Sequence, residues 1–234
     1  MPENPVAGRV VLLAGATSLS GLAAARVLAS AGARVVAVGR DSARLDSLRV
    51  LNDRLTETGS PAARLEVCDV TDEAAVRELT QHVHSAIGRV DGILHLVGGW
   101  RGGGGLAGQS EDDYRFLERS FTALRVVSRA FDPDLRASDA GRLAIVSSSA
   151  VARPLAGGAN YAAVKAASEA WTRAVAQGYA KSARDAGEPL RAAAVIFRVK
   201  ALEGLEQTLA AAYAGLWAQD ADGINDSVIT LGGA

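Results

Sequence analysis

Short apolar runs alternate with helix-like segments along all 234 residues, and this alternation constrains the fold more than any other feature. Near-continuous apolar strands separated by helices favour a parallel sheet that is covered on both faces. The expected strands are Val10–Ala14, Arg34–Val38, Leu65–Cys68, Ile93–Val97, Leu143–Ser147, Ala192–Phe197 and Val228–Leu231. The expected helices are Ser20–Ala31, Ser42–Thr58, Asp72–Ile87, Glu111–Phe131, Tyr161–Asp185 and Leu202–Ala218.

Right-handed crossovers between such strands predict a doubly wound α/β Rossmann fold. We expect a seven-stranded, mainly parallel sheet with helices on both faces. The chain is long enough for one large core, and it contains neither a repeat nor a composition break, so residues 1–234 are expected to form a single domain. Ligands of such a fold bind at the carboxyl ends of the strands.

Charge and composition argue against several classes of partner. The formal net charge is −1 and no basic block occurs, which disfavours nucleic acid or an anionic membrane as the main partner. The lone Cys68 excludes an internal disulfide and a thiolate metal cluster. No segment resembles a signal peptide or reaches transmembrane length, so we expect a soluble, cytoplasmic protein. The three histidines lack a carboxylate cluster at ligand spacing, so no metal site is expected.

The segment from Arg142 to Ala176 carries the strongest chemical signal. A strand-like run leads into three serines, a loop rich in Gly and Pro, and a helical segment that contains Tyr161 and Lys165. These two residues are four apart and therefore share one helix face. An ammonium beside a phenol is expected to lower the pKa of Tyr161 and make it a proton donor or acceptor nearer neutral pH.

This order of strand, serine, loop and Tyr-x-x-x-Lys resembles the active-site segment of the short-chain dehydrogenase/reductase family. The resemblance extends over essentially the whole chain and is weakest beyond residue 198. In the family, the serine usually lies thirteen residues before the tyrosine, which selects Ser148, although loop-length variation leaves Ser149 open. The resemblance implies hydride transfer between NADP(H) and a small-molecule carbonyl or alcohol. Ser148 would polarise the carbonyl, Tyr161 would protonate its oxygen, and Lys165 would favour the phenolate and contact the nicotinamide ribose.

The turn after the first expected strand resembles the nucleotide-binding turn of the family. Glycines there allow a tight turn, and the following helix offers its free N–H groups to a pyrophosphate. Leu19 replaces the middle glycine of the family pattern, which would cost about 1–2 kcal/mol if that position needs a positive φ. Alternatively, the turn follows another path and side-chain hydroxyls supply donors. The candidate residues are Gly15, Thr17, Ser18, Leu19, Ser20 and Gly21.

Two further positions bear on the nucleotide. Gly39 stands where the NAD enzymes of the family carry Asp, and Arg40 follows as in its NADP enzymes. Arg40 is therefore expected to bind the 2′-phosphate of NADP, the alternative being a surface arginine. Asp69 and Val70 resemble the adenine-contacting segment of the family, the alternative for Asp69 being a helix cap.

Besides Leu19, the chain departs from the family pattern at three further places. Residues 96–99 include Val97, Gly98 and Gly99, which are expected at the cofactor, yet Leu96 and Val97 replace asparagines that brace the pocket. Ser120 stands where the family carries a fourth catalytic residue, an Asn that holds a water; it either does the same or is simply a helix residue. The substrate lid after the sixth strand is largely absent, so we expect an open site unless a second subunit or the 98–108 loop covers it.

Other interpretations of this pattern remain open. The glycine-rich 98–108 loop is either a flexible connector or a rim of the site. Cationic residues near the mouth would favour an anionic substrate unless they are scattered surface charge; they are Arg101, Arg153, Arg198 and Lys200. A homodimer or homotetramer is implied by the family. The rival function is an NADP(H)-binding regulatory or scaffolding protein that has lost catalysis, and the sequence does not identify the substrate.

Overall fold

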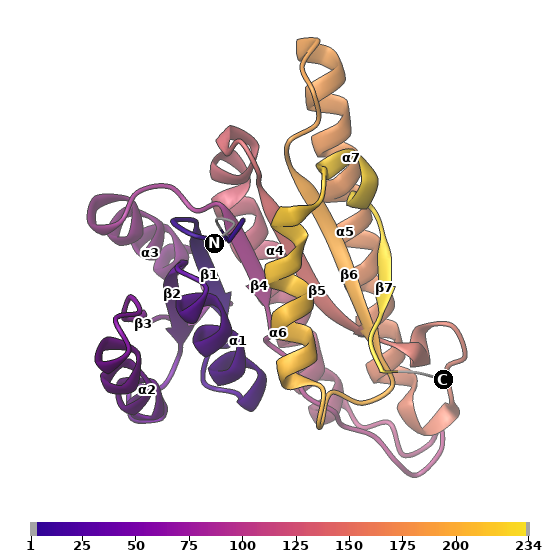
Figure 1. Ribbon diagram of the computed structural model, residues 1–234. Helices are drawn as coiled ribbons and strands as arrows, with labels where there is room; N and C mark the ends of the chain where they lie inside the picture. The colour runs from indigo at the N-terminus through magenta and orange to yellow at the C-terminus, as the bar shows by residue number, and fades with distance from the viewer. Residues whose placement is uncertain (1–3, 233–234) are drawn as a thin grey trace.

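A single seven-stranded sheet runs through the computed structural model, which describes residues 4–232 (Figure 1). Its strand order is β3-β2-β1-β4-β5-β6-β7, and every neighbouring pair is parallel. The strands are β1 (Val10–Ala14), β2 (Arg34–Gly39), β3 (Arg64–Val67), β4 (Gly92–His95), β5 (Arg142–Ser148), β6 (Ala193–Val199) and β7 (Val228–Thr230). The predicted doubly wound Rossmann fold is therefore confirmed.

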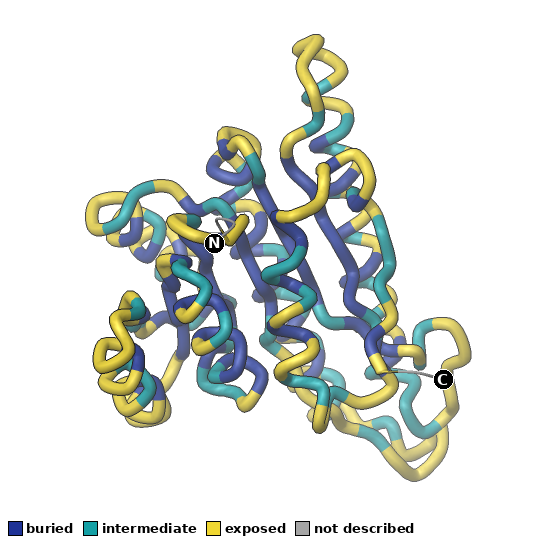
Figure 2. Tube along the Cα trace, in the orientation of Figure 1, coloured by how far each residue is buried: buried dark blue, intermediate teal, exposed yellow. Residues whose placement is uncertain are grey.

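Helices cover both faces of the sheet, as Figure 1 shows. One layer contains α1 (Leu19–Ser30), α2 (Asp46–Glu57) and α6 (Glu206–Ala214), and the other contains α3 (Glu73–Ala86), α4 (Glu111–Ala137) and α5 (Ala159–Ala186). The alternation along β1 produces the two layers: Val11 and Leu13 face the first, whereas Val10 and Leu12 face the second. Figure 2 shows the inner strands β1, β2, β4, β5 and β6 as the buried centre of the molecule, whereas the edge strands β3 and β7 contain no fully buried residue.

The strand order reverses between β1 and β4. From β1 the chain winds outward to β2 and β3, and it then returns to place β4 on the opposite side of β1. In open α/β sheets, such a switch point leaves a crevice outside the carboxyl ends of the strands. The glycine turn, the residues after β4 and the start of α5 all lie at this edge.

Two regions differ from the expected elements. Helix α4 continues to Ala137 through Pro133, because Phe131 and Leu135 are fully buried and Asp134 accepts the Val90 N–H at 3.0 Å. Packing thus outweighs the hydrogen bond that Pro133 removes. The segment expected as one helix over 202–218 instead contains α6 and a 3-10 turn at Gly215–Ala218, and a short α7 (Ala221–Ile224) follows. Within residues 4–232, no helix combines the length and the apolar character needed to cross a membrane.

Candidate active site

Two cavities meet at the switch point of the sheet. The larger, of about 1020 Å³, lies against β4, β5, β6 and the start of α5, and the smaller, of about 270 Å³, lies against β1, β2 and β3. They share wall residues at the boundary, namely Ser18, Leu96, Val97 and Gly98. An extended ligand can therefore run from one cavity into the other.

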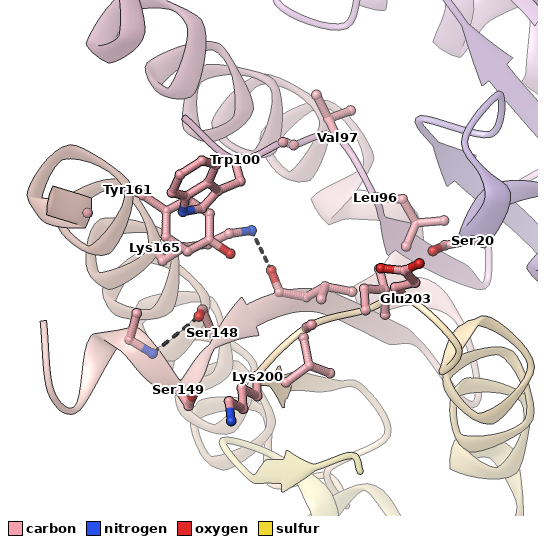
Figure 3. A pocket seen from close by; sticks show the side chains of 18 of the residues that line it. Ser20, Leu96, Val97, Trp100, Ser148, Ser149, Tyr161, Lys165, Lys200 and Glu203 are labelled. Carbon is pink, nitrogen blue, oxygen red and sulfur yellow. Dashed lines mark hydrogen bonds between the residues drawn. The ribbon is translucent and has the colours of Figure 1, made fainter. Parts of the chain in front are cut away.

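Ser148, Tyr161 and Lys165 come together on the wall of the larger cavity (Figure 3). The Ser148 hydroxyl accepts a hydrogen bond from the Ala150 N–H at 3.2 Å, and its interaction with the Tyr161 hydroxyl acts to lower the pKa of that phenol. Ser149 lines the same cavity but is exposed, so the geometry favours Ser148 of the two candidate serines. The Lys165 Nζ donates to the Val146 carbonyl at 2.7 Å and lies 5.8 Å from the centre of the Tyr161 ring.

The expected lowering of the Tyr161 pKa is wrong for this arrangement. Burial raises the pKa of Tyr161, and the hydrogen bond with Ser148 offsets only part of that rise. Burial also lowers the pKa of Lys165 to about 8, although the charge of Glu169 opposes it. Burial therefore shifts both groups toward their neutral forms, although Lys165, which donates to a carbonyl oxygen, stays mostly protonated below about pH 8.

An ion pair between Glu169 and Arg198 lies next to Lys165 along α5. Glu169 lies one helical turn further along α5, accepts the Ser147 hydroxyl at 2.6 Å and pairs with Arg198 of β6 at 2.6 Å. Ser147, the first serine of the triplet, therefore bonds to this pair and does not line the cavity. Arg198 is likewise engaged by Glu169 and is not a cation at the mouth. No sequence pattern predicts this pair, because its members are far apart in the chain.

Ser120 is buried on α4 near the boundary of the two cavities. Its hydroxyl donates to the Leu117 carbonyl at 2.7 Å within the same helix. Its own carbonyl is hydrogen-bonded to Nε2 of His95 at 3.1 Å. The geometry therefore favours the second alternative for Ser120, that of a helix residue. His95, which the sequence placed only in a strand, lies in the cavity wall.

The turn after β1 has no space for a side chain at its two tightest positions, Gly15 and Gly21. Gly15 has a φ of +92°, and a Cβ on Gly21 would lie 2.3 Å from the Ala16 carbonyl oxygen. Ser18 caps α1 by accepting the Gly21 N–H at 3.0 Å. Leu19 is the first residue of α1, is 74% exposed, and has no positive φ. Leu19 therefore carries no left-handed strain.

The hydroxyl residues of the turn divide between the cavities. Thr17 lines the smaller cavity, Ser20 lines the larger, and Ser18 lines both. Val70, Val97 and Gly98 also lie in the wall of the smaller cavity, whereas Gly99 lies in that of the larger one.

The tip of β2 has no room for a side chain at Gly39. A Cβ there would lie 2.7 Å from Cγ2 of Thr17. Arg40 lines the smaller cavity, as expected, and it is joined by Arg44, which the sequence did not single out. Both arginines are exposed, so they can reach a ligand in this cavity without moving out of the core.

Asp69, which follows the neighbouring strand β3, also lines the smaller cavity. It accepts the backbone N–H and the hydroxyl of Thr71, at 3.0 and 2.7 Å, and it pairs with Arg119 of α4 at 2.9 Å. Burial raises its pKa, but these hydrogen bonds and the charge of Arg119 outweigh burial and leave the pKa lowered. Asp72, and not Asp69, caps α3. The neighbouring Cys68 is buried, and burial raises the pKa of its thiol to about 11, in keeping with an unreactive strand-end residue.

The glycine-rich 98–108 loop forms a rim of the larger cavity. Its Gly103 N–H donates to the Gly157 carbonyl at 2.7 Å, and a Cβ on Gly102 would lie 2.3 Å from the same oxygen. Gln109 fixes the contact: its amide donates to the carbonyls of Gly103 and Gly157 at 3.1 and 3.0 Å, and its oxygen accepts the Asn160 N–H at 3.1 Å. The loop is thereby joined to the first turn of α5, just before Tyr161.

Apolar side chains border the mouth of the larger cavity. Trp100 of the glycine-rich loop is 60% exposed and Leu155 is 78% exposed. Residues 199–203 form the wall after β6. Of the four expected cations, Arg153 and Lys200 line the cavity, whereas Arg101 stacks over the Phe116 ring at 4.1 Å.

Among residues 4–232, no three or more His, Cys, Asp and Glu side chains lie close enough together to hold a metal ion. The groups that can hold a ligand here are instead hydroxyls, backbone N–H groups and arginines. These groups suit an anionic, polyhydroxylated molecule.

Comparisons with known proteins agree with this geometry. Residues 9–183 match the family model described as short chain dehydrogenase. A fatty acyl-CoA reductase of Acinetobacter baylyi is 30% identical over 176 residues, which cover 73% of this chain and 57% of that protein. The match thus spans little more than half the length of that relative.

Solved structures share the fold at low identity. A metagenomic short-chain oxidoreductase in complex with NADP has a TM-score of 0.80 at 24% identity, with 98% of this chain and 100% of that chain covered. A gluconate 5-dehydrogenase of Burkholderia cenocepacia, in complex with NADP and tartrate, has a TM-score of 0.80 at 22% identity, with 98% and 96% covered. Since the family model matches most of the chain, the protein belongs to the short-chain dehydrogenase/reductase family of oxidoreductases.

Proposed function

We propose that this protein is an NADP(H)-dependent oxidoreductase that interconverts a carbonyl compound and its alcohol. The observation that carries the proposal is the convergence of Ser148, Tyr161 and Lys165 on one wall of a cavity that continues into a second, arginine-lined cavity. We further propose that residues 1–234 act as one nucleotide-binding domain. Homo-oligomerisation through α4 and α5 stays a prediction from the family.

The cofactor site fits a dinucleotide at points where the backbone itself must come close. A Cβ on Gly15 would lie 2.9 Å from the Val97 nitrogen, so the turn leaves no space for a side chain there. The first turn of α1 offers N–H groups that lack partners within the helix. Thr17, Ser18 and Ser20 surround this turn, so the pyrophosphate would lie at the boundary of the two cavities.

The smaller cavity supports NADP(H) over NAD(H). A carboxylate on residue 39, which would bind the ribose hydroxyls of NAD, would place its Cβ against Thr17. Arg40 and Arg44 instead offer guanidinium groups to a 2′-phosphate, and Asp69, which lines the same cavity, is available to the adenine. These residues are the proposed determinants of cofactor choice.

When bound, NADPH would supply the hydride that reduces the carbonyl carbon, and NADP⁺ would remain. Ser148 would donate a hydrogen bond to the carbonyl oxygen and so polarise it. Tyr161, which burial keeps as a phenol, would give its proton to that oxygen as the alcohol forms. The Lys165 ammonium would stabilise the remaining phenolate and contact the nicotinamide ribose.

The walls of the larger cavity support an apolar carbonyl or alcohol as the substrate class. Trp100 and Leu155 border the mouth, and Leu202 lies on the wall after β6. The cationic Arg153 and Lys200 at the same mouth would accept a negative group at the far end of such a molecule. The name of the Acinetobacter relative, a fatty acyl-CoA reductase, is compatible with this class but does not fix the substrate.

The rival function, nucleotide binding without catalysis, is favoured by the apolar Leu96 and Val97 at the cofactor. Tyr161→Phe separates the two because it removes one hydroxyl and keeps the ring. For an enzyme, NADPH-dependent reduction of a panel of ketones and quinones should fall by about 10²–10⁴-fold, with little change in NADPH affinity by fluorescence titration. Wild-type turnover that Tyr161→Phe leaves unchanged would disprove the role of Tyr161. Tight NADPH binding without any turnover would support the rival function.

A further inference from the structure

His95 presents a buried hydrogen-bond acceptor to the active site. It ends β4, its side chain is 6% exposed, and it shares the wall of the larger cavity with Tyr161 and Lys165. Nε2 is hydrogen-bonded to the Ser120 carbonyl at 3.1 Å. Nδ1 is equally buried and has no hydrogen-bond partner among residues 4–232.

The contact with Ser120 fixes the tautomer of the imidazole. A backbone carbonyl only accepts, so Nε2 carries the hydrogen and Nδ1 keeps its lone pair. Burial, and then the charge of Lys165, lowers the pKa of His95 to about 3, so the ring stays neutral. Buried acceptors in folded proteins nearly always have a donor, which makes Nδ1 an acceptor in need of one.

Lys165 has donors to offer. Its ammonium carries three N–H groups, of which one is used by the Val146 carbonyl. Tyr161 of the same helix has its ring centre 5.8 Å from Nζ, and His95 of β4 lies in the same cavity wall. The charge of Glu169 on α5 raises the pKa of Lys165, and the charge of Lys165 lowers that of His95. Arg198 of β6 is paired with Glu169, and α4 contributes the non-titrating Ser120.

We propose that His95 is a positioning residue whose Nδ1 accepts a hydrogen bond from the Lys165 ammonium through one bridging water. The proposal rests on the proposed function of Lys165. Ser120 is less suited to this task, because its hydroxyl is bonded to Leu117 and its carbonyl to His95. An acceptor on this side stabilises the charged form of Lys165 relative to the neutral amine and orients it for Tyr161.

Two substitutions distinguish the role of Nδ1 of His95 from that of Nε2. An asparagine oxygen lies about as far from the backbone as Nδ1, whereas a glutamine amide reaches about as far as Nε2. His95→Asn therefore keeps an acceptor toward Lys165 and loses the contact with Ser120. His95→Gln keeps the contact with Ser120 and loses the acceptor.

In NADPH-dependent reduction, His95→Gln should lower kcat by roughly tenfold and move the loss of activity at high pH to lower pH by about half a unit or more. His95→Asn should retain most of kcat and the wild-type pH profile. Both variants should bind NADPH as the wild type does. The opposite ranking, or two variants that match the wild type, would overturn the proposal and leave His95 as a brace between β4 and α4.

A second measurement does not depend on turnover. Competitive labelling with acetic anhydride, followed by mass spectrometry, gives the pKa of each lysine, with the exposed Lys181 and Lys200 as internal references. The pKa of Lys165 should fall in His95→Gln but not in His95→Asn, even if the protein proves to be a binding module. If His95→Gln does not fold, the ¹⁵N resonance of Nδ1 in the wild type and in Lys165→Met decides: an unchanged resonance would refute the contact.

Discussion

Removal of the Arg40 guanidinium tests the proposed preference for NADPH over NADH, because it should weaken the binding of NADPH alone. Arg40 and Arg44 are the exposed cations at the tip of β2 in the wall of the smaller cavity. A charge-assisted hydrogen bond contributes about 1.5–3 kcal/mol, which corresponds to roughly 10- to 150-fold in affinity. Arg40→Ala should therefore weaken NADPH binding by that factor and leave NADH, which lacks the 2′-phosphate, within about twofold.

Fluorescence titration or calorimetry with both nucleotides measures this difference directly. Arg49→Ala is the matched control, because Arg49 is also exposed, lies on the adjoining α2, pairs with Asp46 at 3.1 Å and lines neither cavity. It should change neither affinity. Equal weakening of NADPH and NADH by Arg40→Ala would refute the assignment, since a phosphate contact cannot affect a nucleotide that lacks the phosphate.

The same corner of the site offers a test by gain of binding. Gly39→Asp alone should bind NADH poorly, because its Cβ would lie 2.7 Å from Cγ2 of Thr17. Thr17→Ser removes that methyl group, so the pair of substitutions should bind NADH more tightly than Gly39→Asp alone. If Gly39→Asp by itself already prefers NADH, the steric argument for NADP is wrong.

Two further predictions concern helix α5 and the rim of the larger cavity. Gln109→Ala should raise KM for an apolar carbonyl substrate by about tenfold while the NADPH Kd stays unchanged, because Gln109 joins the rim to α5 and does not line the smaller cavity. Substitution of the exposed Gln81 by Ala is the control in steady-state kinetics. A loss of NADPH affinity as large as the rise in KM would contradict the prediction. Lys165→Met should stabilise the fold by about 1–2 kcal/mol below pH 8, because the folded state there carries a buried ammonium whose pKa is lowered from 10.5 to about 8. That gain should fade as the pH rises from 8 to 10.5 in thermal or urea unfolding, and a gain that does not depend on pH would contradict it.

The sheet was predictable because its inner strands are buried on both faces. A run such as Val10–Ala14 is apolar at every position, and its observed bounds are those expected. Element ends were less predictable where tertiary contacts set them. Pro133 argued for a helix that stops near Phe131, yet the burial of Leu135 and the contacts of Asp134 carry α4 on to Ala137.

The candidate site was predictable where one local stretch carries it. Tyr161 and Lys165 share a helix, and the turn that contains Gly15 is continuous in sequence. Gln109 and His95 were missed for the opposite reason. Gln109 acts on residues about fifty positions away, and the significance of His95 depends on a carbonyl of α4. No spacing rule within one element can detect such partners.

The sign of the Tyr161 pKa shift illustrates the limit of spacing most clearly. Two residues four apart on a helix lie on the same face, but their spacing does not determine where a long side chain ends. Lys165 extends to the Val146 carbonyl, nineteen residues earlier in the chain. Its ammonium therefore does not donate to the Tyr161 hydroxyl and does not lower the pKa of the phenol. Burial then dominates both pKa values: it keeps Tyr161 a phenol and lowers the pKa of Lys165, whose ammonium nevertheless prevails below about pH 8. A phenolate at Tyr161 becomes favourable only when the ammonium turns toward the ring, so the groups that orient Lys165, with His95 among them, determine how readily Tyr161 gives up its proton.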